Sequence, residues 1–151
     1  MNDSLHIVCP HCRSLNRVPA GRLADRPNCG RCHAPLFTGH PIALTAEDFH
    51  AHASRADIPL AVDFWASWCG PCLMMAPAFE AAARVLEPHV RLAKVNTEEQ
   101  QGLAAQFGIT SIPTLILFRG GREIARQPGA MSQQQIVQWV RAHLERAGTA
   151  G

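Results

Sequence analysis

The sequence lacks the features that would place the chain in a membrane or on a nucleic acid. No apolar run approaches the roughly 18 residues that a membrane-spanning helix needs. Residues 1–8 contain no Lys or Arg and no long apolar stretch, so no secretory signal is visible and we expect a cytoplasmic protein. The formal net charge of the 151-residue chain is only +2, which favours neither nucleic acid nor membrane as a partner.

What the chain does contain is cysteine, in two separate groups. Without a visible signal, six cysteines indicate metal or redox chemistry rather than a framework of disulfides. Four of them lie near the N-terminus, and Cys69 and Cys72 stand apart in the middle of the chain. None is left over.

Cys69 and Cys72 lie at the start of a helix that the pattern predicts over residues 69–86. At that position Cys69 would meet unpaired backbone N–H groups and the positive end of the helix dipole, which favour thiolate over thiol. Cys72, one turn further, could attack a mixed disulfide formed at Cys69. The pair could therefore cycle between dithiol and disulfide with no bound organic cofactor. The motif is completed by Trp68, Gly70 and Pro71.

The alternative for these two thiols is a metal knuckle or inert core cysteines. A zinc knuckle needs a second Cys or His pair downstream at zinc-finger spacing. The sequence offers none there, so the redox interpretation is favoured.

Asp63 lies within an otherwise apolar strand predicted over residues 60–65. A buried carboxyl with a raised pKa would suit proton exchange with Cys72. The structural alternative is an acid paired with Lys94, which is isolated in another apolar strand, residues 90–95. The two roles are compatible.

Pro113 precedes a third buried strand, which is an unusual place for proline. The sequence alone does not choose between a cis and a trans bond before it.

The remaining pattern alternates strands and helices, which predicts an α/β unit. A short strand is expected over 42–44, and further strands over 114–118 and 122–126 with a turn at Gly120 and Gly121. One helix is predicted over residues 45–54, capped by Thr45 and Asp48. A second is predicted over 97–107, capped by Thr97 and ended by Gly108. A final helix is capped by Ser132 and Gln135, and its apolar stripe consists of Ile136, Trp139, Val140 and Leu144.

The N-terminal cysteines have the spacing of a four-thiolate zinc site. The pattern is C-x2-C-x16-C-x2-C, formed by Cys9, Cys12, Cys29 and Cys32. Residues 1–38 have little helical periodicity and few apolar residues, so we expect this segment to need a metal to fold.

Other interpretations of these cysteines remain open. Cys9-Pro-His-Cys12 resembles the dipeptide of strongly oxidising redox sites, but no helix is predicted after it. Cys29-Gly-Arg-Cys32-His33 matches a c-type haem attachment pattern, which would require export and leave two cysteines unexplained. Two disulfides, or His11 or His33 replacing a cysteine, are further options. We expect the other histidines, such as His50, His52 and His89, to be solvated.

Several stretches together resemble thioredoxin, over residues 41–147 in order and in spacing. They are residues 62–72, 76–77, 94–96, 108–114 and 128–130. The resemblance implies a thioredoxin fold, with a central mixed sheet flanked by helices. It also implies that Cys69 attacks, that Cys72 resolves, that Asp63 and Lys94 handle a proton, and that a cis bond precedes Pro113 beside the disulfide. Leu73 departs from the family, where a basic residue is common.

A zinc-ribbon-like module over residues 1–38 followed by such a domain resembles the thioredoxin family's two-module type. This resemblance implies a protein disulfide reductase that is recharged by thioredoxin reductase and acts on disulfide-containing proteins. We expect a monomer that binds Zn²⁺.

Two other functions remain open. The chain could be a zinc-dependent binding module on a thioredoxin-like scaffold, or a redox sensor that loses zinc when its thiolates oxidise. Residues 1–38 lack an aromatic and basic cluster, which weakens a nucleic-acid role.

Overall fold

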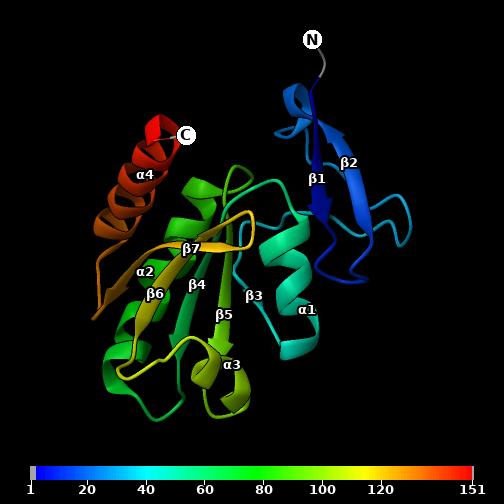
Figure 1. Cartoon of the computed structure of the whole chain (residues 1–151). Coiled ribbons are helices and arrows are strands. Elements are labelled where there is room, and N and C mark those ends of the chain that lie inside the picture. The colour runs from blue at the N-terminus through cyan, green and yellow to red at the C-terminus, as the bar shows by residue number, and fades with distance from the viewer. Residues whose placement is uncertain (1–2, 151) are drawn as a thin grey trace.

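In this computed structural model, which describes residues 3–150, a small two-stranded sheet lies beside a five-stranded sheet (Figure 1). The small sheet pairs β1 (Ser4–Val8) with β2 (Leu15–Pro19) in antiparallel register. Neither strand is predicted from the sequence, because each has only five residues and the two flank a cysteine-rich turn without a clear period. A single 3₁₀ turn, Ala20–Arg22, follows β2.

The larger sheet has the strand order β3-β5-β4-β6-β7. Strands β3, β5 and β4 run parallel, β6 runs antiparallel to β4, and β7 runs antiparallel to β6, so the predicted mixed sheet is confirmed. The strands are β3 (Ile42–Ala43), β4 (Leu60–Trp65), β5 (Arg91–Asn96), β6 (Thr114–Arg119) and β7 (Arg122–Pro128).

Helices cover both faces of this sheet. The helices α2 (Gly70–Leu86) and α4 (Gln133–Ala150) enclose one apolar cluster against one face, while α1 (Ala46–His50) and α3 (Gln101–Gln106) enclose another on the opposite face. The predicted apolar stripe of the last helix packs into the first of these clusters. Among residues 3–150, no helix is long and apolar enough to cross a membrane.

Two predicted helix caps are confirmed and one is wrong. Thr45 and Asp48 form a capping box on α1, and Ser132 and Gln135 exchange hydrogen bonds at the start of α4. Thr97 was expected to cap a helix, but its hydroxyl donates to the carbonyl of Trp65 and the helix begins only at Gln101. The side chain of the preceding Asn96 instead accepts the first free N–H groups, which holds residues 97–99 in a turn.

The prediction that His52 is solvated is wrong. Helix α1 continues as a π-helical turn, Ala51–Arg55, that carries His52 inward, and only 2% of its surface is exposed. Burial, with the nearby charge of Arg91, lowers the pKa of His52 to about 4. His50 and His89 are exposed, as expected. His50 and His52 lie two residues apart, on nearly opposite sides of the helix, so one faces solvent and the other the interior.

The two sheets share an apolar cluster. Ile7, Val18, Leu23 and Leu36 of the N-terminal segment pack with Ala56 and Ile58, which precede β4. The N-terminal segment therefore completes its core with residues of the second unit.

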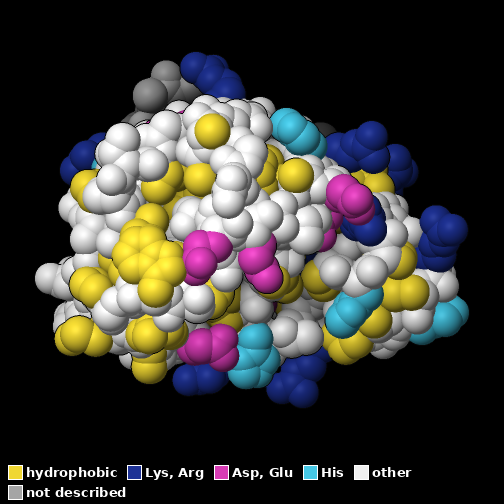
Figure 2. All heavy atoms as spheres, turned by 90° about the horizontal axis from the view of Figure 1, so that it is seen from below, with side chains coloured by type: hydrophobic (Ala, Val, Ile, Leu, Met, Phe, Trp, Pro, Cys, Tyr) yellow, Lys and Arg dark blue, Asp and Glu magenta, His cyan; other side chains and the backbone are white. Residues whose placement is uncertain are grey.

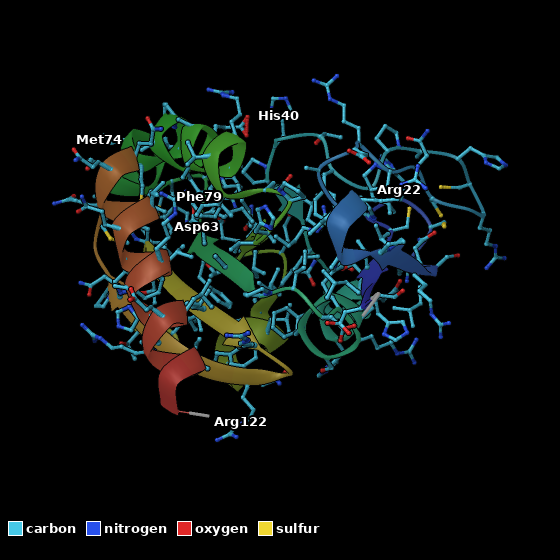
Figure 3. The ribbon with its side chains drawn as sticks, turned by 90° about the horizontal axis from the view of Figure 1, so that it is seen from above. Arg22, His40, Asp63, Met74, Phe79 and Arg122 are labelled. Carbon is cyan, nitrogen blue, oxygen red and sulfur yellow. A yellow bond between two sulfur atoms is a disulfide. The ribbon has the colours of Figure 1, made fainter. Side chains whose placement is uncertain are left out.

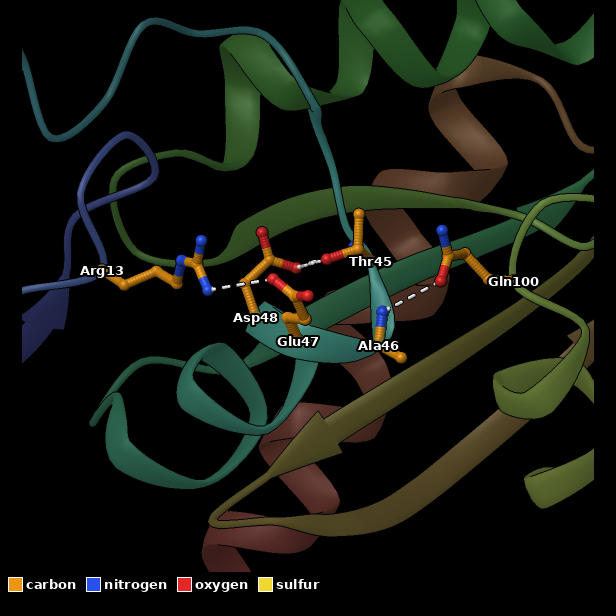
Figure 4. Close-up of polar contacts among 6 residues, drawn as sticks. All are labelled: Arg13, Thr45, Ala46, Glu47, Asp48 and Gln100. Carbon is orange, nitrogen blue, oxygen red and sulfur yellow. Dashed lines mark hydrogen bonds and ion pairs between the residues drawn. The ribbon is translucent and has the colours of Figure 1, made fainter.

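Polar contacts strengthen the same junction. The N–H and ring of His6 both contact the carboxylate of Asp57, at 2.7 and 3.0 Å. Arg13 reaches Glu47 on α1 at 3.6 Å, next to the Thr45–Asp48 cap (Figure 4). Because both partners of the Arg13 pair are exposed, that pair contributes little.

Candidate redox site and four-cysteine cluster

Cys69 and Cys72 form a disulfide at the N-terminal end of α2. The buried strand β4 ends at Trp65, and the chain then turns so that Cys69 is the N-cap residue of the helix and Pro71 lies in its first turn. The backbone N–H of Cys72 donates to the sulfur of Cys69 at 3.2 Å. That hydrogen bond and the helix dipole both favour negative charge on the Cys69 sulfur when the pair is reduced.

The surroundings of this disulfide are asymmetric. Both sulfur-bearing residues are buried and pack with Ala66 and Ile112, whereas 69% of Trp68 is exposed. The sulfur of Cys69 lies 3.7 Å from the carbonyl oxygen of Ile112. The Ile112–Pro113 bond is cis, as the resemblance implied. The structure thus brings Trp68, Gly70, Pro71 and Pro113 to the same end of the sheet as the two cysteines.

Asp63 is fully buried in β4. Side chains alternate along a strand, so Asp63 shares the face of Ala61, which packs under α2 (Figure 3). Neither carboxyl oxygen has a hydrogen-bond partner. Burial raises the pKa of Asp63 to about 7, and the charge of Lys94 opposes this shift only in part.

Lys94 lies directly beside Asp63 in the register of β4 and β5. The two side chains form no ion pair, because the Lys94 ammonium lies over the ring of Trp65, 4.5 Å from its centroid. The structural alternative of a simple Asp63–Lys94 pair is therefore wrong for this state. Lys94 acts on Asp63 only through its charge at longer range.

The four N-terminal cysteines converge on one point. Their sulfur atoms all lie within 4.8 Å of one another, with Cys9–Cys32 and Cys12–Cys29 at 3.6 Å. A tetrahedral zinc ion with bonds of about 2.3 Å to sulfur would require sulfur atoms about 3.8 Å apart, so the arrangement fits zinc. No disulfide links these cysteines.

Backbone N–H groups surround this cluster. The sulfur of Cys9 accepts from His11 and Cys12, and the sulfur of Cys29 accepts from Arg31 and Cys32. The bond from Cys32 lowers the pKa of the Cys29 thiol to about 5, and burial opposes this shift. Such bonds stabilise thiolates, the form that binds a metal. His11 and His33 are exposed and are not part of the cluster.

One residue that the sequence analysis missed connects the cluster to the larger sheet. Arg91, at the start of β5, is 3% exposed and donates to the carbonyl oxygens of Leu36 at 2.8 Å and Val8 at 3.2 Å. Its guanidinium also lies 4.3 Å from the centroid of the Phe37 ring. Burial lowers the pKa of Arg91 to about 10, so it still carries its charge at neutral pH. In the sequence it appears only as one charged residue within the strand predicted over residues 90–95.

Comparison with known proteins agrees with this geometry. The family model described as Thioredoxin matches residues 40–142, and the zinc-ribbon model described as Thioredoxin 2, N-terminal, matches residues 8–34. Thioredoxin C-3 of Corynebacterium nephridii is 44% identical over 139 residues, covering 92% of this chain and 95% of that protein. A thioredoxin of Alicyclobacillus acidocaldarius is 46% identical over 95 residues, covering 63% of this chain and 90% of that protein.

Solved structures show the same likeness. A mutant thioredoxin from Halobacterium salinarum superposes with a TM-score of 0.64 at 27% identity, covering 71% of this chain and 93% of that one. A Malassezia sympodialis thioredoxin gives 0.62 at 30% identity, covering 67% and 88%. The chain belongs to the thioredoxin family, as a thioredoxin-type disulfide oxidoreductase with an N-terminal zinc-ribbon segment.

Proposed function

We propose that the chain is a protein disulfide reductase in which Cys69 is the nucleophile and Cys72 the resolving thiol. The observation that carries this proposal is the position of the Cys69 sulfur, at the end of α2 with an N–H donor and an exposed tryptophan beside it. Cys72 is more deeply buried and so suits the second step.

The exchange balances without an added cofactor. The Cys69 thiolate attacks one sulfur of the substrate disulfide, a mixed disulfide forms, and the first substrate sulfur leaves as a thiolate that takes up a proton. Cys72 loses its proton and attacks the Cys69 sulfur, which releases the second substrate thiol. The substrate gains two electrons and two protons, and the protein keeps the Cys69–Cys72 disulfide.

Asp63 is proposed as the group that accepts the Cys72 proton. Its carboxyl lies on the face of the sheet under α2, has no hydrogen-bond partner, and has a pKa raised by burial to about 7. An acid that titrates near neutral pH can take up and release a proton in each cycle. Lys94 would favour the ionised form through its charge. Trp68, Gly70, Pro71 and Pro113 would form the surface that an extended substrate segment meets.

The N-terminal segment is proposed to hold one Zn²⁺ through Cys9, Cys12, Cys29 and Cys32. The distances between the sulfur atoms and the N–H donors around them support this assignment. When bound, zinc would supply a structural cross-link between the two knuckles.

We further propose that the chain consists of two units, residues 1–38 and 41–147, and that it is a monomer located in the cytoplasm. We propose that thioredoxin reductase, using NADPH, returns the Cys69–Cys72 disulfide to the dithiol.

The test of the reductase proposal is insulin reduction coupled to thioredoxin reductase and NADPH. The full chain should consume NADPH in proportion to its concentration, and Cys69→Ser should abolish this. Cys72→Ser should instead accumulate a mixed disulfide with the substrate, visible by mass spectrometry as an adduct that dithiothreitol removes. Activity that persists in Cys69→Ser would overturn the assignment of the nucleophile.

A further inference from the structure

The surface around the disulfide is strongly apolar. Five large apolar side chains are exposed in the described part of the chain, and three of them lie within five residues of Cys69. These are Trp68, Leu73 and Met74, which are 69%, 52% and 80% exposed. In Figure 2, which views the molecule from below, hydrophobic side chains gather toward the left of the face shown. An exposed apolar concentration of this kind marks a contact surface for another molecule.

One edge of this surface is acidic. The turn after β5 lies beside the redox loop, because the N–H of Thr97 donates to the carbonyl of Trp65 at 2.8 Å. The hydroxyl of Ser67 donates to the carboxylate of Glu98 at 3.1 Å. The side chain of Asn96 accepts from the N–H groups of Glu98 and Glu99, at 2.9 and 3.3 Å, which fixes the turn. Glu98, which binds Ser67 beside Trp68, and its neighbour Glu99 are both exposed, so two carboxylates lie on the turn that borders the redox loop.

No basic residue offsets these carboxylates in the segments that border the disulfide. Ile112 contacts Cys69, Pro113 accepts a hydrogen bond from Gly129, and Met131 donates to the sulfur of Met75, so two further loops meet at this site. The bordering segments are residues 66–76, 96–100, 108–113 and 128–132, and none contains Lys or Arg.

The 14 basic residues of the chain lie elsewhere. Lys94, in β5 beside Asp63, is half-buried with its ammonium over the Trp65 ring. Lys and Arg side chains lie mostly toward the periphery of the face in Figure 2, whereas acidic side chains lie beside the apolar group. The redox face is therefore negative in a chain whose formal net charge is +2.

We propose that this face selects disulfide substrates whose reacting segment carries an apolar residue beside the cysteine and a lysine or arginine close by. The proposal rests on the reductase function proposed above. The apolar residue would cover Leu73 and Met74, and the basic residue would meet Glu98 and Glu99. A positive segment would also be steered toward the face, while an acidic segment would meet two uncompensated carboxylates.

The experiment compares two cyclic disulfide peptides that differ only in two flanking residues, lysines in one and glutamates in the other, each with a leucine beside the cysteine. Reduced full-length protein is mixed with each peptide, and oxidation is followed by tryptophan fluorescence in a single turnover, so that no reductase takes part. We expect the lysine peptide to react about tenfold faster at low salt, and the ratio to fall toward about twofold at roughly 0.5 M salt.

The matched variants isolate the acidic edge. Glu98→Gln with Glu99→Gln removes two charges while leaving an oxygen for Ser67, and it should lower the ratio to about threefold or less. Asp3→Asn with Asp25→Asn makes the same charge change on the N-terminal segment and should leave the ratio unchanged. Equal rates for both peptides, or a ratio that survives Glu98→Gln with Glu99→Gln, would overturn the proposal. If the protein reduces neither peptide nor uncharged hydroxyethyl disulfide, the reductase function itself fails.

Discussion

The buried guanidinium of Arg91 donates a hydrogen bond to the carbonyl oxygen of Val8, the residue directly before the first cysteine of the N-terminal cluster. The same side chain binds Leu36 at the other end of the N-terminal segment. One strand of the larger sheet thus holds both ends of that segment.

Replacing Arg91 should therefore loosen the N-terminal segment. Arg91→Leu leaves two buried carbonyls without a donor, and we expect a loss of about 3 kcal/mol in the free energy of unfolding. Hydrogen exchange should accelerate in β1 and β2 more than in β6. Arg84→Leu, on the exposed end of α2, is the control and should change stability by less than about 0.5 kcal/mol. Equal effects of the two variants would show that the Arg91 contacts contribute nothing.

Acid should destabilise the protein through His52. The pKa of His52 is about 4 in the folded state, below the usual 6.5. Between these two values the unfolded chain binds a proton at this residue and the folded chain does not. Stability is therefore lost as the pH falls through 6.5 toward 4, by as much as about 3 kcal/mol. Asp63 changes stability in the opposite direction over the same range, so the test is the difference between two chains: in urea unfolding, His52→Gln should gain stability relative to the unmodified chain as the pH falls from about 7 to about 4. His50→Gln, its exposed neighbour, should retain the slope of the unmodified chain, and a parallel slope in His52→Gln would refute the assignment.

The elements that the sequence predicted well are those with a strong local period. The apolar run at residues 60–65 has the same bounds as β4, and the caps at Thr45 and Ser132 depend on residues only three apart. Leu60–Trp65 is buried from both faces, which explains why its pattern is continuous rather than alternating.

What the sequence did not predict depends on contacts between distant segments. His52 is buried in a π-helical turn, next to Ala51, which packs against the cluster of the N-terminal segment, and neither feature leaves a local sign in the sequence. The Arg91 contacts join residues 55 and 83 positions apart. The acidic edge of the redox face likewise arises only when the turn after β5 is placed beside Ser67.

Removing zinc should unfold the N-terminal segment and leave the larger sheet folded. Among the described residues, the buried apolar cluster of this segment includes only two residues from outside it, Ala56 and Ile58. Because so small a core gives little stability, we expect the metal to supply much of it. We expect one zinc per chain by native mass spectrometry, and its removal by a chelator should reduce hydrogen-exchange protection of β1 and β2 by at least about tenfold. Cys12→Ser should have the same effect without chelator. A metal-free chain with two N-terminal disulfides would exclude the zinc site.

Raising the pH from about 4 to about 7 should reduce stability through Asp63, which is opposite in sign to the effect of His52 over the same range. The pKa of Asp63 is about 7 in the folded state against an ordinary 3.8, so between these values the unfolded chain ionises while the folded chain keeps its proton. The penalty is absent below pH 3.8, grows as the pH rises, and is complete above pH 7, at about 4 kcal/mol. Asp63→Asn should therefore stabilise the oxidised protein at about pH 8.5 and have little effect at about pH 4. Exposed Asp3→Asn is the control.

The same variant separates the stability effect of Asp63 from its role in proton transfer. If Asp63 accepts the Cys72 proton, Asp63→Asn should slow the release of substrate from the mixed disulfide at neutral pH by about 10²-fold or more, while the first attack by Cys69 is little changed. Quenched-flow mass spectrometry of the mixed disulfide resolves the two steps. A variant that is more stable above pH 7 yet resolves the mixed disulfide at the normal rate would leave Asp63 a buried acid without a part in the reaction.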